Sequence, residues 1–398
     1  MYKTLIITFI IFLQISNSHD VWASEKSTKK TMNNALESLI KLSPFIGSEI
    51  KFQDPQFEKK IEVELIKLVN TFKDAKHNKE IKLPNLYPSY QLLTNNLEEA
   101  LFNFQNGNKV FSRLRLNETT NLCLSCHTQI PKDHLTSSLF DKKQNDKNFI
   151  DSPFEKARFF YVIRDYKNAL ASFDDTIIQK LSSKKLSAEK SKNILFSDNL
   201  YDKKLYQSFY QSIIIYTKVL KTPTVASQKL TYYINNFKIP NYIITDLNNW
   251  KEQLRPWIKI EKELSKPMSI TQLKIYIKTI EEKMKRKNEE LASGSFDIDL
   301  MMISGLLGNY YQENHKKEIN GEVLYWLGVS EYRLSKTLFF NLGDHYLQSC
   351  INNNPKTAIA KKCYESLENE IKFRYTGSAG TLMPDPVKAK LQKLKLNI

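Results

Sequence analysis

The sequence predicts an all-α protein. Its 398 residues include only 10 glycines and 13 prolines, which leaves little turn chemistry for a many-stranded sheet or a glycine-rich nucleotide-binding fold. Apolar residues recur at spacings of three and four along most of the chain, which is the period of an amphipathic helix. The hydrophobic share of 41% is sufficient for a buried core. We therefore expect long helices in about two domains.

Residues 1–23 have the pattern of a secretory signal peptide. Lys3 precedes an apolar run from Leu5 to Ile15, and a small-residue cleavage site ends at Ala23. The run is too short to cross a bilayer as a helix, and no later stretch is long and apolar enough. We expect a soluble periplasmic protein that begins at Ser24 and has no transmembrane span. The alternative is an uncleaved N-terminal segment that tethers the chain to the membrane.

Three helical stripes precede the chain's most informative motif. Asp54-Pro55 and residues 84–88 separate the stripes, and a fourth helix is expected to begin near Asn108. The stripes are Met32, Leu36, Leu39 and Ile40; Phe57, Ile61, Leu65, Leu68 and Phe72; and Leu93, Leu97, Ala100, Leu101 and Phe104. The sequence therefore predicts four helices, with the motif at the end of the last one.

The motif is Cys123-x-x-Cys126-His127, the attachment pattern of c-type haem. Residues three apart share one face of a helix, so two thiols can add to the two vinyl groups of one porphyrin edge. The adjacent His127 is then the proximal iron ligand. A thioredoxin-like pair needs a βαβ setting, a zinc site needs two further ligands, and a chance match is the remaining alternative. Export supports covalent haem independently, because the attachment requires it.

The order of these elements resembles the cytochrome c′ family of four-helix bundles, in which the haem lies near the C-terminus of the final helix. The resemblance covers residues 31–130 and implies a haem-binding bundle over residues 24–135. One departure concerns the residues that follow the haem histidine. The aromatic and basic residues common in that family are replaced here by Thr128, Gln129, Ile130 and Pro131.

Met32 is the candidate for the distal iron ligand. The first methionine after the motif is Met268, too far along the chain for the common small cytochrome c arrangement. In low-spin members of the cytochrome c′-like family, a methionine of the first helix takes this position, and Met32 is expected to point inward. Ordinary core packing of Met32, ligation by His77 or His134, and an open distal face remain alternatives. Gly380 to Pro384 is similar to a cytochrome methionine loop, but a turn before a helix is favoured.

Residues 136–150 are polar and lysine-rich and are predicted to form a linker to a second helical domain, residues 151–398. Two segments of this domain resemble tetratricopeptide helix pairs, which implies an α-solenoid; an irregular helical domain is the alternative. No repeat can be aligned between about residues 195 and 320. The matching positions are Ala157, Phe160, Tyr166, Ala169 and Phe173, and more loosely Leu324 to Gly328 with Tyr332.

Cys350 and Cys363 are expected to form a disulfide. They lie 13 residues apart across a predicted turn, and an exported protein folds under oxidising conditions. The bridge is expected to stabilise the fold by roughly 3 kcal/mol in the chain-entropy model. A redox-active pair is the alternative, but nothing nearby marks either thiol as activated.

The formal net charge is +16, but lysines are spread along the whole chain, which disfavours nucleic acid as a partner. We expect an exported mono-haem c-type cytochrome that transfers single electrons, with a redox partner or other protein held by the helical-repeat domain. One alternative is a haem-based gas or redox sensor with an open distal site. Another is an envelope scaffold with an ancillary haem. No convergent acid, base and nucleophile indicate an enzyme, and peroxidase-like activity requires distal groups that the pattern does not identify.

Overall fold

The computed structural model describes residues 28–78, 81, 87–127, 152–182, 200–286, 296–314, 321–334, 342–378 and 380–398. These residues form helices and a single two-stranded hairpin, which confirms the all-α class. The predicted signal peptide (1–23) and linker (136–150) lie outside the described residues. Within the described part of the chain, no helix combines the length and apolar character that a bilayer crossing needs. The chain divides into two compact units, one made of residues 1–123 and 136–150 and the other of residues 124–135 and 151–398.

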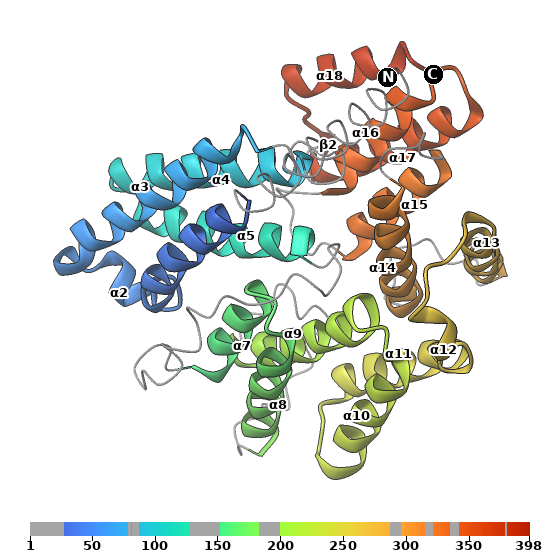
Figure 1. Cartoon of the computed structure of the whole chain (residues 1–398), viewed down its shortest axis with the longest axis horizontal. Helices are drawn as coiled ribbons and strands as arrows, with labels where there is room; N and C mark the ends of the chain where they lie inside the picture. Colours follow the sequence, from blue (N-terminus) through green and yellow to red (C-terminus); the bar gives the residue numbers. More distant parts are fainter. Residues whose placement is uncertain are drawn as a thin grey trace, which may run out of the picture. The chain divides into compact units, whose positions relative to one another are not determined.

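The first unit contains four long helical segments (Figure 1). They are residues 28–46, α3 (Glu58–Ala75), α4 (Tyr87–Gln105) and α5 (Lys109–His127), with the short α2 (Glu49–Gln53) and the 3-10 turn η1 (Pro55–Phe57) after the first. The last four residues of α5, 124–127, are assigned to the second unit. Ser48 caps α2 and Asp54 caps η1, each through its side-chain oxygen. Gly107, at φ +78°, makes the turn between α4 and α5. The four helices therefore lie where the apolar stripes predict them.

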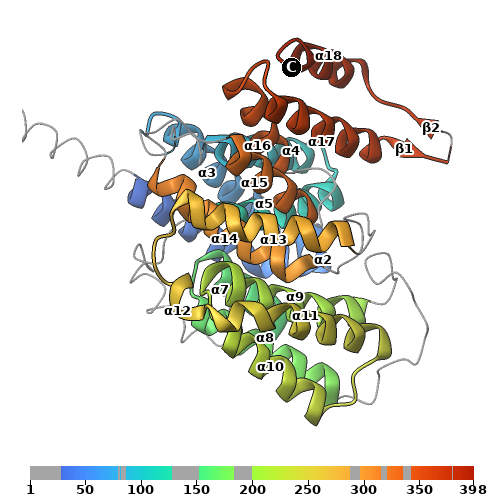
Figure 2. The same ribbon diagram turned by 90° about the vertical axis from the view of Figure 1, so that its right-hand side faces the viewer.

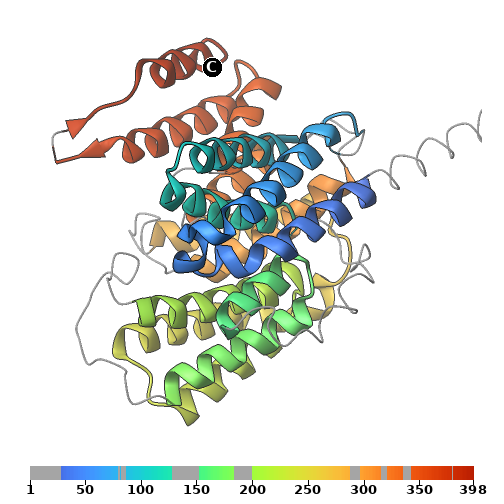
Figure 3. The same cartoon turned by 90° about the vertical axis from the view of Figure 1, so that its left-hand side faces the viewer.

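Each long helix of the first unit runs antiparallel to the next. Hydrogen bonds at two positions along the helix axes join each consecutive pair. They are Asn78–Thr31 and Ser38–Glu64 between residues 28–46 and α3, Tyr90–Phe72 and Gln105–Glu62 between α3 and α4, and Asn96–Thr119 and Ser112–Ala100 between α4 and α5. Figure 3 shows these helices side by side, in blue to teal. Because the direction alternates, the start of segment 28–46, the end of α3, the start of α4 and the end of α5 lie at one end of the unit.

The second unit is a longer succession of helices (Figure 2). Trp250, Phe209 and Leu327 belong to its continuous buried core, which extends from α8 to α18. The helices are α7 (Pro153–Val162), α8 (Tyr166–Ser182), α9 (Leu200–Ile214) continued by the π-helical turn η3 (Ile215–Val219), α10 (Pro223–Asn236), α11 (Asn241–Lys259), α12 (Glu261–Leu264), α13 (Ile270–Arg286), α14 (Asp297–Glu313), α15 (Gly321–Leu334), α16 (Leu342–Asn353), α17 (Ala358–Arg374) and α18 (Asp385–Lys395). Strands β1 (Thr376–Gly377) and β2 (Gly380–Thr381) pair antiparallel between α17 and α18.

Helices α7 and α8 form a tight helical hairpin. Arg164 takes the left-handed conformation, with φ +67°, at the turn. The Asp165 carboxylate then accepts a hydrogen bond from the backbone N–H of Asn168 at 3.2 Å and caps α8. The small and aromatic residues that the sequence singles out in this stretch are all buried. They are Ala157, Phe160, Tyr166, Ala169 and Phe173.

Helices α15 and α16 pack closely because Gly328 has no side chain. A Cβ atom built on Gly328 would lie 2.6 Å from Cγ of Leu347, well inside van der Waals contact. The next connection, between α16 and α17, carries the predicted disulfide. The sulfur atoms of Cys350 and Cys363 lie 2.01 Å apart and both residues are buried, so the predicted pairing is confirmed.

Candidate functional site

The Cys-x-x-Cys-His motif forms the C-terminal end of α5, the last of the four long helical segments described above. The backbone remains helical through His127. Positions 123 and 126 therefore lie on one face of the helix, nearly one turn apart. The Cys123 side chain is partly buried; the side chains of Cys126 and His127 lie outside the described residues. The helical backbone thus provides the spacing that the motif requires.

Cys123 continues the buried stripe of α5. Ser112, Leu116 and Thr119 precede it at helical spacing, and each is almost fully buried. The amide of buried Asn96 on α4 donates to the Thr119 hydroxyl and to the Arg115 carbonyl, both at 2.7 Å. Buried hydrogen bonds of this kind fix the rotation of one helix against its neighbour. The face that carries Cys123 is therefore held in register by α4.

Salt bridges fasten the opposite, N-terminal half of α5. Arg113 pairs with Glu49 of α2 at 2.6 Å, and the Lys109 ammonium pairs with Glu58 of α3. Arg113 also donates to the Ile46 carbonyl at 3.3 Å. Exposed pairs contribute little stability individually. Together they attach the helix that carries the motif to the first three helical elements of the unit.

The structure brings the predicted distal-ligand candidates to the same end of the first unit as Cys123. Asn78 donates to the Thr31 hydroxyl at 3.3 Å. This contact places the turn that contains His77 next to the start of segment 28–46, where Met32 lies. The C-terminal part of α5 reaches the same end because the four helices alternate in direction. His134 lies outside the described residues.

Met32 is less enclosed than its place on the apolar stripe predicts. Its side chain is 37% exposed, because the fully buried part of this helix begins one turn later at Ala35. His77 is exposed in the turn after α3. The structure records no contact that selects either side chain as a ligand, so both assignments remain predictions.

Tyr90 joins α4 to α3 at this end of the unit. The Tyr90 hydroxyl donates to the Phe72 carbonyl at 2.6 Å. Burial raises the pKa of Tyr90, and nearby acidic groups raise it further. The phenol therefore remains a neutral hydrogen-bond donor at physiological pH, and it satisfies a carbonyl in the last turn of α3.

The donor set at this end fits a covalently attached haem. Two thiols on one helical face and an adjacent imidazole are the groups that thioether attachment and axial ligation require. The zinc alternative is weaker, because the disulfide uses Cys350 and Cys363, the other two cysteines of the chain. Among the described residues, no group of three or more His, Cys, Asp or Glu side chains is placed to hold a metal ion.

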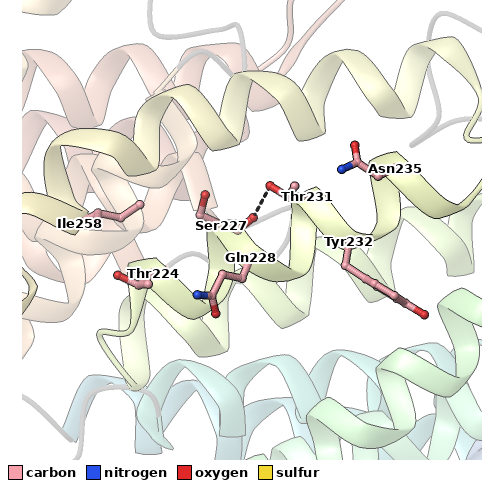
Figure 4. Close-up of a pocket in the computed structure, with 7 residues that line it drawn as sticks. All are labelled: Thr224, Ser227, Gln228, Thr231, Tyr232, Asn235 and Ile258. Carbon is pink, nitrogen blue, oxygen red and sulfur yellow. Dashed lines mark hydrogen bonds between the residues drawn. The ribbon is translucent and has the colours of Figure 1, made fainter.

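The second unit has an open groove along α10 (Figure 4). Tyr232 is largely exposed there, and the Thr231 hydroxyl donates to the Ser227 carbonyl of its own helix at 2.9 Å. None of the lining side chains carries a charge, and the Tyr232 phenol is the one titratable group among them. The lining residues are Thr224, Ser227, Gln228, Thr231, Tyr232, Asn235 and Ile258.

A buried charged cluster lies elsewhere in the second unit. The Lys218 ammonium and the Glu331 carboxylate are 2.6 Å apart and almost fully buried. The Ser304 hydroxyl donates to the same carboxylate at 2.7 Å. Sequence reasoning missed this cluster. The sequence contains one indication of it. Lys218 and Glu331, which are 113 residues apart, carry opposite charges and each lie inside an apolar helical stretch.

Comparison with known proteins identifies no relative: no family model, no curated protein and no solved structure matches this chain. We therefore infer the function from the chemistry and placement of the chain's own residues.

Proposed function

We propose that this protein is an exported mono-haem c-type cytochrome that exchanges single electrons with a partner protein. The observation that carries the proposal is the Cys-x-x-Cys-His motif on the last turns of a helix fastened to its neighbours. A bound haem supplies a one-electron redox centre. The predicted signal peptide supports the proposal, because covalent attachment of haem c requires export.

The chain's own residues have distinct tasks in this proposal. Cys123 and Cys126 tether the porphyrin edge, and His127 holds the proximal axial position. Asn96 and Ser112 keep the rotation of α5 fixed, so the tethering face remains directed toward the same end of the unit. Met32 provides the distal ligand, and a thioether at this position favours a higher reduction potential than a second histidine does.

The finer architecture is part of the same proposal. The first unit is a haem-binding four-helix bundle of the cytochrome c′-like kind, supported by the antiparallel order of its four long helices. The second unit is a tetratricopeptide-like solenoid that holds the partner. The burial of small and aromatic residues in α7 and α8 supports this assignment, as does the close contact at Gly328.

A second candidate function is a haem-based gas or redox sensor with an open distal site. The observation that favours it is the partial exposure of Met32, since a side chain outside the packed core is less firmly held as a ligand. The two candidates share the covalent haem and differ only in the occupancy of the distal face.

The test is production of the full chain in a bacterium that attaches haem c in its periplasm. The wild-type protein should be coloured, and its haem should stay with the polypeptide after acid–acetone extraction. The Cys123→Ser and Cys126→Ser variants should lose covalent haem, whereas Ser125→Ala, between the two cysteines, should retain it. Haem that is fully extracted from the wild type would overturn the proposal and leave an envelope scaffold.

A further inference from the structure

The two-stranded hairpin between α17 and α18 carries large apolar side chains in solvent. Phe373, in the last turn of α17, is 74% exposed, and Leu382, directly after β2, is 76% exposed. Tyr375, directly before β1, is also exposed. Figure 2 shows the two strands projecting beyond the end of α17. Exposed clusters of large apolar residues are uncommon and indicate interaction sites.

The register of the hairpin sorts its side chains onto two faces. Thr376 pairs with Thr381, and their hydroxyls are hydrogen-bonded at 2.7 Å. The amide of Leu382 donates to the Tyr375 carbonyl at 2.9 Å, so these two residues are the next opposing pair. Opposing residues share a face and successive pairs alternate. The ribbon therefore has a threonine face and a tyrosine–leucine face.

The end of the hairpin is open. Gly380 has φ +96°, a conformation that suits glycine. A Cβ atom added at Gly377 or at Gly380 would have no atom within 4 Å. Nothing in the described part of the second unit therefore covers this end of the ribbon.

The C-terminal part of the second unit carries net positive charge. Residues 371–384 contain Lys372 and Arg374 and no acidic residue, and residues 356–398 hold nine Lys and Arg against four Asp and Glu. Asp344 binds Arg374 at 2.7 Å and Glu368 binds Lys372 at 3.1 Å, so both cations beside the hairpin have acidic partners. On α18, Lys390, Lys393 and Lys395 are exposed and make no ion pair with the described residues.

We propose that this hairpin and the lysines of α18 form a docking surface for an anionic lipid bilayer. Aromatic and aliphatic side chains at a projecting hairpin suit insertion at the headgroup boundary, and the exposed lysines of α18 suit anionic headgroups. An acidic protein would match the lysines, whereas a bilayer matches the lysines and also takes up the apolar Phe373 and Leu382 at the base of the hairpin. The inference adds to the proposed function a location at the membrane surface, and it does not depend on the haem.

Co-sedimentation of the full exported chain with lipid vesicles tests the proposal. We expect binding to vesicles that contain phosphatidylglycerol, weak binding to pure phosphatidylcholine, and a loss of binding as salt rises. The double variant Phe373→Ser with Leu382→Ser should bind about tenfold more weakly or worse. Ile50→Ser is the matched control, because Ile50 is 84% exposed in the first unit and should not affect binding.

A spectroscopic variant distinguishes insertion from simple charge attraction. In Phe373→Trp, anionic vesicles should shift the added tryptophan emission to shorter wavelength, as an apolar surrounding requires. The proposal is overturned by an absence of vesicle binding, by binding that the double variant retains, or by an unshifted emission. Because none of these readouts uses the haem, a colourless protein that still binds vesicles would refute the proposed function and leave this inference standing.

Discussion

Met32 is the residue on which the electron-transfer and gas-binding candidates differ. Its helix begins at the end of the first unit that also holds the end of α5, and its side chain is partly exposed. A methionine thioether on iron blocks the position that a small gas would take. The identity of the distal ligand therefore decides which candidate function is correct.

We expect the reduced wild-type protein to keep its spectrum when carbon monoxide is added, and Met32→Ala to show a rapid shift. Met284→Ala, a partly buried methionine of the second unit, is the matched control and should behave as wild type. A wild-type protein that binds the gas as fast as Met32→Ala would remove Met32 as the ligand and favour the sensor.

The buried pair of Lys218 and Glu331 gives a second prediction at this scale. Among the described residues, Lys218→Met leaves the buried Glu331 carboxylate with the Ser304 hydroxyl as its one hydrogen-bond partner, and we expect a loss of about 3–5 kcal/mol in the free energy of unfolding. The double variant with Glu331→Leu should recover much of this loss, since no charge then remains buried. Urea unfolding followed by circular dichroism measures both.

Lys393→Met is the control for Lys218→Met, because Lys393 is exposed on α18 and its replacement should change stability by no more than about 0.5 kcal/mol. Equal, small losses for Lys218→Met and Lys393→Met would show that the buried pair does not stabilise the second unit.

Among the elements, the contact between α15 and α16 depends most clearly on one residue. We expect Gly328→Ala to cost about 1–3 kcal/mol of unfolding free energy, because its methyl group would overlap the Leu347 side chain. Gly377→Ala, which has open space around it, should be nearly neutral. Urea titration of the two variants provides the measurement, and a Gly328→Ala protein as stable as Gly377→Ala would contradict the close packing.

Most helices of the first unit were predictable because their apolar residues repeat at helical spacing. The stripe that contains Leu65 and Leu68 became α3, and the stripe that contains Leu97 and Ala100 became α4. The short elements α2 and η1 were not predictable in this way, because capping by Ser48 and Asp54 defines them rather than a long apolar stripe.

The π-helical turn η3 and the buried ion pair of Lys218 and Glu331 were not predictable from the spacing of apolar residues. At Gly305 an added Cβ would lie 2.4 Å from the carbonyl oxygen of Lys218, so α14 and η3 approach at backbone distance. Such contacts depend on which helices meet in space, and a single sequence does not contain that information. The Cys-x-x-Cys-His motif, in contrast, was visible because its three defining residues lie within five consecutive positions, 123–127.

At the scale of the whole molecule, the formal charge of +16 accords with partners and surfaces of opposite sign. An anionic membrane and an acidic redox partner are both accessible to an exported protein. The proposed docking hairpin and the proposed haem motif use different residues, so each can be removed by substitution while the other is measured.

The mass of the intact protein purified from the periplasm shows whether one haem is covalently attached. We expect one species, the chain from Ser24 to Ile398 plus a single haem, with the Cys350–Cys363 bridge intact. A mass equal to the polypeptide alone would contradict this expectation, because no porphyrin would then be bound to Cys123 and Cys126.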